Sequence, residues 1–171
     1  MTNQPVNLEQ TTAITLPEVE GLPSVSVSFQ KTQEGIARLV EAKYVNPSTY
    51  TELEFTYGEG YRECKTSLSN IGYFIARTEQ AIRAIKSGYL LDEYPAFRKE
   101  KGLSDNAANR DAFLEAQEDY RNAVERLDQL KALETFVEGR VKIFENVTRY
   151  MRKQMDLIRN SGIDPNKYGA K

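Results

Sequence analysis

Basic and aromatic side chains are interleaved in two stretches of the chain. Cationic side chains can follow a phosphate backbone, while an aromatic ring offers a surface on which an unpaired base stacks. Single-stranded nucleic acid is the ligand that this combination favours. The residues that we expect to bind it are Arg77, Arg83, Lys86, Arg140, Lys142, Arg149, Tyr150, Arg152, Lys153 and Arg159.

The net charge of −2 for the 171 residues hides a strong segregation of charge along the chain. Residues 1–60 and 102–138 each carry a net charge of −5, whereas residues 61–101 carry +3 and residues 139–171 carry +5. Two basic segments that meet in the fold would form a cationic surface at one end. The alternative stays open: these charges are solvated faces of long helices, and the aromatic rings belong to the core.

Side chains suited to catalysis or metal binding are few. The chain has no His and one Cys, which excludes Ser-His and Cys-His catalysis, His-metal sites and an internal disulfide. The Gly-rich motif that cradles nucleotide phosphates, G-x-x-x-x-G-K-[ST], does not occur in the sequence. We expect Cys64 to be a small buried core residue. The sequence therefore predicts a non-catalytic protein without metal or cofactor.

The hydropathy pattern predicts a cytoplasmic protein that does not enter a membrane. The longest hydrophobic stretch, residues 71–76, is far shorter than the roughly 20 residues needed to span a bilayer. No basic residue precedes Lys31, and no apolar core of signal-peptide length follows the first residue. A single cysteine also suits a reducing compartment.

The first 30 residues are predicted to form an extended arm. Proline, which interrupts helices and sheet ladders, is concentrated near this end of the chain. Within the arm, Val25, Val27 and Phe29 alternate with serines, a pattern typical of a short strand with one apolar face. A helical domain is expected over residues 31–160, followed by a C-terminal tail at 161–171.

Helical periodicity dominates the rest of the chain. A short helix is expected over residues 32–43, and a long helix over about 50–94. Apolar residues repeat at alternating intervals of three and four from Tyr61 to Tyr89, which predicts a helix packed along one stripe. Pro95 is expected to kink or end this helix.

A second apolar seam runs from Phe113 to Ile158 and predicts a long helix over about 105–160. The predicted turn near residues 102–106 is so short that the two long helices must run antiparallel. The fold class is therefore expected to be all-α: a long, coiled-coil-like antiparallel helical hairpin with a short N-terminal helix and an extended, proline-containing arm.

In this hairpin, residues 61–89 are expected to fold back along about 133–160, which brings the two basic segments together. The later helix also carries an additional apolar stripe between Leu133 and Leu157. One partner helix covers one stripe, so the additional stripe needs a second cover. The helix at 32–43 folding back, another subunit, or both together would provide this cover. We expect a homo-oligomer.

The arrangement of basic helix, polar turn and second helix with a basic and aromatic end resembles the UvsY-type recombination mediators of phages. More broadly, it is similar to small helical phage proteins of DNA replication and recombination. The resemblance covers about residues 60–160, and the stretches that carry it are residues 94–102, 104–111 and 133–144. It implies an oligomeric, non-catalytic protein that binds single-stranded DNA, displaces single-strand-binding protein and helps load a recombinase.

A structural or assembly protein is the alternative that the sequence also allows. Such a protein would be a phage virion component or a helical adaptor. In that case, the strand-like segment of the arm would add to the sheet edge of a neighbouring subunit. The arm, rather than the basic surface, would then carry the function.

Overall fold

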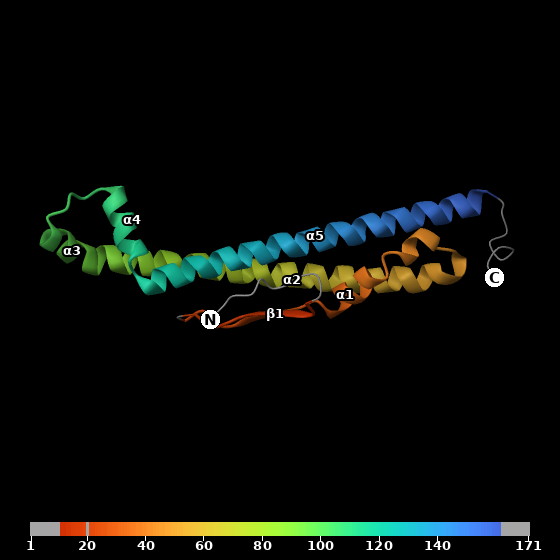
Figure 1. Cartoon of the computed structure of the whole chain (residues 1–171), viewed down its shortest axis with the longest axis horizontal. Helices are drawn as coiled ribbons and strands as arrows, with labels where there is room; N and C mark the ends of the chain where they lie inside the picture. The colour runs from red at the N-terminus through yellow and green to blue at the C-terminus, as the bar shows by residue number, and fades with distance from the viewer. Residues whose placement is uncertain (1–10, 20, 162–171) are drawn as a thin grey trace. The chain divides into compact units, whose positions relative to one another are not determined.

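The computed structural model describes residues 11–19 and 21–161 (Figure 1). These residues are mostly helical, so the all-α prediction is confirmed in outline. A small two-stranded sheet precedes the helices. Most of the predicted C-terminal tail, residues 1–10 of the arm and Glu20 lie outside the described residues. Within the described ranges, no helix combines the length and hydropathy needed to cross a bilayer.

The described residues form two compact units. The first unit contains residues 11–14, 27–69 and 135–161, and the second contains residues 15–19, 21–26 and 70–134. Two long helices, α2 (Pro47–Gly88) and α5 (Glu118–Asn160), contribute residues to both units. Each unit is described separately below.

The sheet pairs strands β1 (Ala13–Leu16) and β2 (Val25–Ser28). The predicted alternation in the second strand is confirmed, because Val25 and Val27 are buried while the serines between them are exposed. Phe29, the next apolar residue of this pattern, is also buried, and its ring meets the Phe136 ring edge-on at 5.6 Å. The apolar face of the arm is therefore part of the core.

The predicted helix over 32–43 is divided into α1 (Gln30–Ala37) and a 3-10 turn, η1 (Glu41–Tyr44). The Glu63 carboxylate from α2 caps the start of α1, accepting hydrogen bonds from the Thr32 amide at 2.7 Å and the Thr32 hydroxyl at 2.9 Å. At the other end, the Tyr57 hydroxyl donates a hydrogen bond of 2.8 Å to the Arg38 carbonyl. Side chains of α2 thus fix both ends of α1, which lies alongside α2 (Figure 1).

The core of the first unit centres on the ring of Phe144. A Cβ atom added to Gly60 on α2 would lie 2.6 Å from Phe144 Cζ, and one added to Gly35 on α1 would lie 2.6 Å from Phe144 Cε1. Two glycines on two helices therefore leave just enough room for one phenylalanine on a third. Since Gly60 meets Phe144 and Glu54 meets Arg152, α2 and α5 run antiparallel within this unit.

The two predicted heptad seams are buried in part: one position in each heptad is fully buried, while other seam positions, such as Leu68 and Ile75, are half-buried. In α2, every seventh residue from Tyr57 through Cys64 and Ile71 to Thr78 is at most 2% exposed. In α5, the equivalent series is Leu130, Val137, Phe144 and Met151, each at most 1% exposed. Thr78, the polar member of the first seam, is buried because its hydroxyl donates to the Phe74 carbonyl at 2.8 Å.

Burial raises the pKa of the Cys64 thiol, and a hydrogen-bond contact with the Thr32 hydroxyl opposes this shift. The reactive thiolate is therefore scarce, and reagents have no access to the sulfur. We expect Cys64 to react slowly with Ellman's reagent at pH 8 in the native protein and rapidly in denaturant. The absorbance of the released thiol measures both rates, and equal rates would contradict this burial.

The first long helix does not end at residue 94. A π-helical turn, η2 (Tyr89–Glu93), connects α2 to α3 (Tyr94–Lys101), so the helical path passes Pro95. Proline lacks an amide hydrogen and clashes with the preceding turn of a regular helix, whereas the first turn of α3 accepts it. Gly102, with a φ of 64°, ends α3, and this predicted stop is confirmed.

The predicted helix over 105–160 is wrong in one respect, because it is broken into α4 (Ala107–Glu115) and α5. Asn106 caps α4 by accepting a hydrogen bond of 2.9 Å from the Asn109 amide. At the break, the Gln117 side chain donates to the Phe113 carbonyl at 3.1 Å, and Phe113 packs among the rings of Tyr89, Tyr94 and Phe97. Figure 1 shows α4 set at a steep angle to the start of α5 within the second unit.

Candidate nucleic-acid interface

Seven of the ten predicted binding residues lie on the last half of α5, in the first unit. The seam turns Val137, Phe144 and Met151 toward the core, so charged residues between them point elsewhere. Six of the seven are exposed: Lys142, Arg149, Tyr150, Arg152, Lys153 and Arg159. The seventh, Arg140, is half-buried, with its guanidinium 4.9 Å from the centre of the Phe136 ring, which favours a packing role.

A groove of about 500 Å³ lies between α2 and α5 within the first unit. Its lining includes two guanidinium groups, two carboxylates and three aromatic rings. The residues that line it are Glu54, Tyr57, Gly58, Tyr61, Phe144, Glu145, Thr148, Arg149 and Arg152. Guanidinium groups and aromatic rings therefore occur in one lining, and proteins that bind single-stranded nucleic acids combine these two kinds of side chain.

The two arginines of the groove differ in their partners. Arg152 donates to the Glu54 carboxylate at 3.2 Å, and this hydrogen bond raises the arginine's pKa. Glu54 also accepts a hydrogen bond of 3.0 Å from Tyr50, whose own pKa is raised by burial. By contrast, Arg149 has no carboxylate within ion-pair distance in the part of the chain that the structure describes. Arg149 is therefore the free cation of the groove.

The tyrosines also divide into structural and available rings. Tyr57 is completely buried, and its hydroxyl is bound to the Arg38 carbonyl, so it offers no surface to a base. Tyr61 is half-buried and lines the groove. Tyr150, which follows Arg149 in the sequence, is 42% exposed. The sequence interpretation assigned Tyr61 to the seam and missed its place in the groove. Its i, i+4 spacing from Tyr57 is the signal that places both on one face.

The remaining predicted residues, Arg77, Arg83 and Lys86, lie in the second unit, exposed on α2. The Arg77 guanidinium donates to the Tyr73 hydroxyl at 3.4 Å. Nearby, Glu79 lies 3.7 Å from Lys131 of α5. These three cations therefore belong to a different unit from the seven on α5.

These contacts correct the expected pairing of residues 61–89 with about 133–160. Of residues 61–89, only 61–69 share a unit with the last half of α5, and they do so together with residues 47–60. The predicted turn at residues 102–106 is present between α3 and α4, but α4 is a separate helix, so η2, α3, this turn and α4 together connect α2 to α5. Opposite the six basic and two acidic residues at 139–160, α2 presents four acidic and two basic residues at 47–69. One result of this opposition is the Arg152–Glu54 ion pair.

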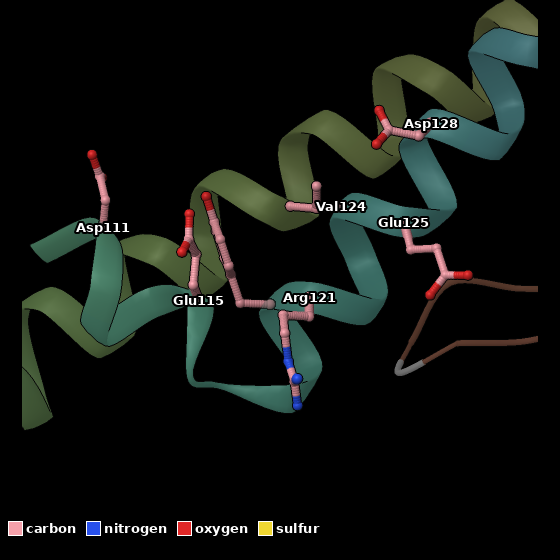
Figure 2. A pocket seen from close by; sticks show the side chains of 7 residues that line it. Asp111, Glu115, Arg121, Val124, Glu125 and Asp128 are labelled. Carbon is pink, nitrogen blue, oxygen red and sulfur yellow. The ribbon is translucent and has the colours of Figure 1, made fainter. Parts of the chain in front are cut away.

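The second unit contains a pocket of about 490 Å³ at the bend between α4 and α5 (Figure 2). Four carboxylates and one guanidinium group belong to its lining, which comprises Asp111, Glu115, Tyr120, Arg121, Val124, Glu125 and Asp128. Figure 2 shows Arg121 and Glu125 pointing away from Asp128. Among the described residues, no group of carboxylates is arranged to hold a metal ion. An acidic surface of this kind repels phosphate, so this pocket is not part of the candidate nucleic-acid interface.

The candidate interface thus consists of the exposed cations of α5, the Tyr150 ring and the groove that contains Arg149 and Tyr61. Comparison with known proteins adds no assignment, because no protein family, curated sequence or solved structure matches this chain. The geometry and charge of these residues are therefore the basis on which a function is proposed.

Proposed function

We propose that this chain is a non-catalytic accessory protein that binds single-stranded DNA along the last half of α5. The observation that carries the proposal is the exposure of Arg149 and Lys153 beside an exposed Tyr150 ring, with Arg159 exposed further along the helix. None of these three cations has a carboxylate partner among the described residues. They are therefore available to phosphates rather than committed to the fold.

The spacing of these residues suits a flexible strand. Between Arg149 and Arg159 the helix rises about 15 Å, which allows several phosphates to be contacted in succession. Tyr150 provides a ring for one base, and stacking of this kind tolerates any base sequence. The groove at Arg149 and Tyr61 offers a second position at which a nucleotide enters between the helices. The proposal therefore predicts binding without strong sequence preference.

The proposal also includes a helical hairpin, self-association and a role in loading a recombinase. The antiparallel pairing in the first unit supports a continuous hairpin of α2 and α5. Self-association is supported by Leu157, 54% exposed at the end of the additional apolar stripe, and by the exposed Tyr44 and Phe55. The resemblance to UvsY-type mediators extends the proposal to a cytoplasmic protein that displaces single-strand-binding protein and helps load a recombinase.

Charge reversal tests where DNA binds. The triple variant Arg149→Glu, Lys153→Glu and Arg159→Glu leaves the Arg152–Glu54 ion pair in place. We expect it to lose affinity for a single-stranded oligonucleotide by about tenfold or more, because three phosphate contacts become repulsive. Fluorescence anisotropy measures the affinity, and circular dichroism checks that helicity is retained.

The matched control makes the same charge change in the second unit, at Arg77, Arg83 and Lys86. Both triple variants have the same net charge, so only a local site distinguishes them. Affinity within about threefold of the wild type is expected for the control. Equal losses in the two variants would show that net charge, and not the surface of α5, governs binding.

The assembly function remains a second candidate because the first unit exposes Val40, Tyr44 and Phe55. In the form expected from the sequence, the arm adds to a neighbour's sheet; the apolar face of Val25, Val27 and Phe29 is already buried within the chain, so the strand edges are what such a contact would use. An assembly protein of this kind would show a multimeric mass by light scattering and no affinity for DNA. A multimer that also binds DNA would favour the first proposal.

A further inference from the structure

A small pocket in the second unit combines charge, an apolar wall and a buried hydroxyl group. It has a volume of about 310 Å³ and lies where the π-helical turn η2, α3 and the start of α4 meet. The residues that line it are Leu90, Leu91, Tyr94, Pro95, Arg98, Asp105 and Arg110. This pocket is separate from the acidic pocket between α4 and α5 and from the proposed DNA interface on the first unit.

The unusual feature of the pocket is the Tyr94 hydroxyl. Tyr94 is only 4% exposed, and its ring packs 5.4 Å from the ring of Phe113. The hydroxyl is buried and has no hydrogen-bond partner among the described residues. Burying such a donor without an acceptor is unfavourable, and most buried hydroxyl groups avoid it. The π-helical turn directly before Tyr94 is also of a kind that recurs at functional sites.

Arg98 and Arg110 both line this pocket, and both form an ion pair with the Asp105 carboxylate. Asp105 accepts from Arg110 Nε at 2.7 Å and lies 3.2 Å from Arg98 Nη1. The hydrogen bond from Arg110 lowers the pKa of Asp105, so this carboxylate is ionised at neutral pH and offsets one of the two positive charges. The second positive charge remains. Each guanidinium group has more N–H donors than Asp105 uses, so Asp105 orients the pair and leaves donors available.

We propose that this pocket binds the phosphate group of a phosphomonoester. Arg98 and Arg110 supply the positive charge and forked donors, and the Tyr94 hydroxyl donates a further hydrogen bond. Three side chains with separate donors match the three terminal oxygens of a phosphate better than the two of a carboxylate. Leu90, Leu91 and Pro95 form an apolar wall for the organic part of the ligand. This inference does not depend on DNA binding by α5.

The experiment uses the full chain with phenyl phosphate and inorganic phosphate as probes. Isothermal titration calorimetry measures their affinities, and thermal melting reports the stability of each variant. We expect Tyr94→Phe to weaken phenyl phosphate binding by about tenfold, the loss of one hydrogen bond to a charged acceptor. The same variant is expected to melt no lower than the wild type, because the missing hydroxyl had no partner.

Arg110→Gln is expected to weaken binding by a similar factor, whereas Arg121→Gln, at the other pocket of the same unit, leaves it unchanged. Three results would overturn the assignment. The wild type could fail to bind phenyl phosphate at about 10 mM, an affinity too weak to matter. Alternatively, Tyr94→Phe could bind as well as the wild type, or it could melt lower, which would show that the hydroxyl already has a partner.

A phosphomonoester occurs both in small metabolites and at the 5′ end of a nucleic-acid strand, and a second pair of titrations separates these sources. Oligonucleotides with a 5′-phosphate and with a 5′-hydroxyl are compared in the Arg149, Lys153 and Arg159 triple variant, in which binding at the proposed DNA interface is weakened. Tyr94-dependent preference for the 5′-phosphate supports the site and identifies a strand end. Tyr94-dependent binding of phenyl phosphate alone supports the site and identifies a small molecule.

Discussion

Replacing Gly60 by alanine is expected to destabilise the protein by about 2 kcal/mol or more, although alanine is ordinarily the better helix former. The new methyl carbon would lie 2.6 Å from Phe144 Cζ, 3.0 Å from Phe144 Cε2 and 3.1 Å from the Lys31 carbonyl oxygen. The ring has little room to retreat, because α1 packs against its other edge so closely that a Cβ added to Gly35 would lie 2.6 Å from Cε1. Overpacking must therefore shift a helix backbone.

Thermal melting followed by circular dichroism measures this effect, and a fall in Tm of about 4–8 °C is expected for a chain of this size. Gly72, also in α2, is the matched control because a Cβ there meets nothing within 4 Å. Gly72→Ala is expected to raise stability by up to about 1 kcal/mol. If Gly60→Ala were as stable as Gly72→Ala, the close packing of Phe144 between two glycines would be refuted.

Removing the Arg126 guanidinium is expected to cost about 3 kcal/mol. Arg126 is 2% exposed, and it donates to the Pro17 carbonyl at 2.6 Å and to the Pro23 carbonyl at 3.1 Å. Hydrogen bonds from charged donors are stronger than neutral ones, and their loss would leave two carbonyl groups without these partners. Burial also lowers the arginine's pKa, which shows that this charge lies in a poorly solvated place.

Arg126→Met tests this prediction while keeping an apolar side chain of similar length. Chemical denaturation measures the stability, and hydrogen exchange reports on the Val19 and Leu22 amides, which pair across the turn held by Arg126. We expect faster exchange at both amides. The control Arg121→Met changes an exposed arginine of the same helix and is expected to alter stability by no more than about 0.5 kcal/mol. Unchanged exchange in Arg126→Met would contradict the role of Arg126.

The features predicted well from sequence are those that depend on local periodicity. Burial of Cys64 and Thr78 follows from their places in a heptad series, and the strand at Val25 and Val27 follows from alternation. The stop at Gly102 follows from glycine's access to a positive φ. In each case the residues that specify the feature lie within a few positions of it.

The features that sequence reasoning missed depend on partners distant in the chain. Periodicity shows that Phe29 has an apolar environment but not that Phe136 supplies it. Likewise, the break before α5 depends on an aromatic cluster that brings Phe113 to Tyr89, Tyr94 and Phe97, and so shifts the helix register. In the sequence, Arg126 cannot be distinguished from other charged residues of the helix, because its hydrogen-bond acceptors are the distant carbonyl groups of Pro17 and Pro23.

The candidate site was predictable only in part for the same reason. Charge segregation identified the basic half of α5 directly, since exposed cations need no partner to be recognised. The groove with Tyr61 and Arg149 required the pairing of α2 with α5, and the expected register was wrong. The register of α2 against α5 also determines which carboxylates lie close to the cations of α5, as the ion pair between Glu54 and Arg152 shows.

The most direct test of the proposed function is a fluorescence anisotropy titration of the wild-type protein with a labelled single-stranded oligonucleotide. Titrations at about 50 and 200 mM salt measure the release of counterions from the phosphates. If Arg149, Lys153 and Arg159 each neutralise one phosphate, the affinity should fall roughly 10- to 20-fold between these concentrations. No binding at the lower concentration, or an affinity that does not change with salt, would contradict a phosphate-binding surface on α5.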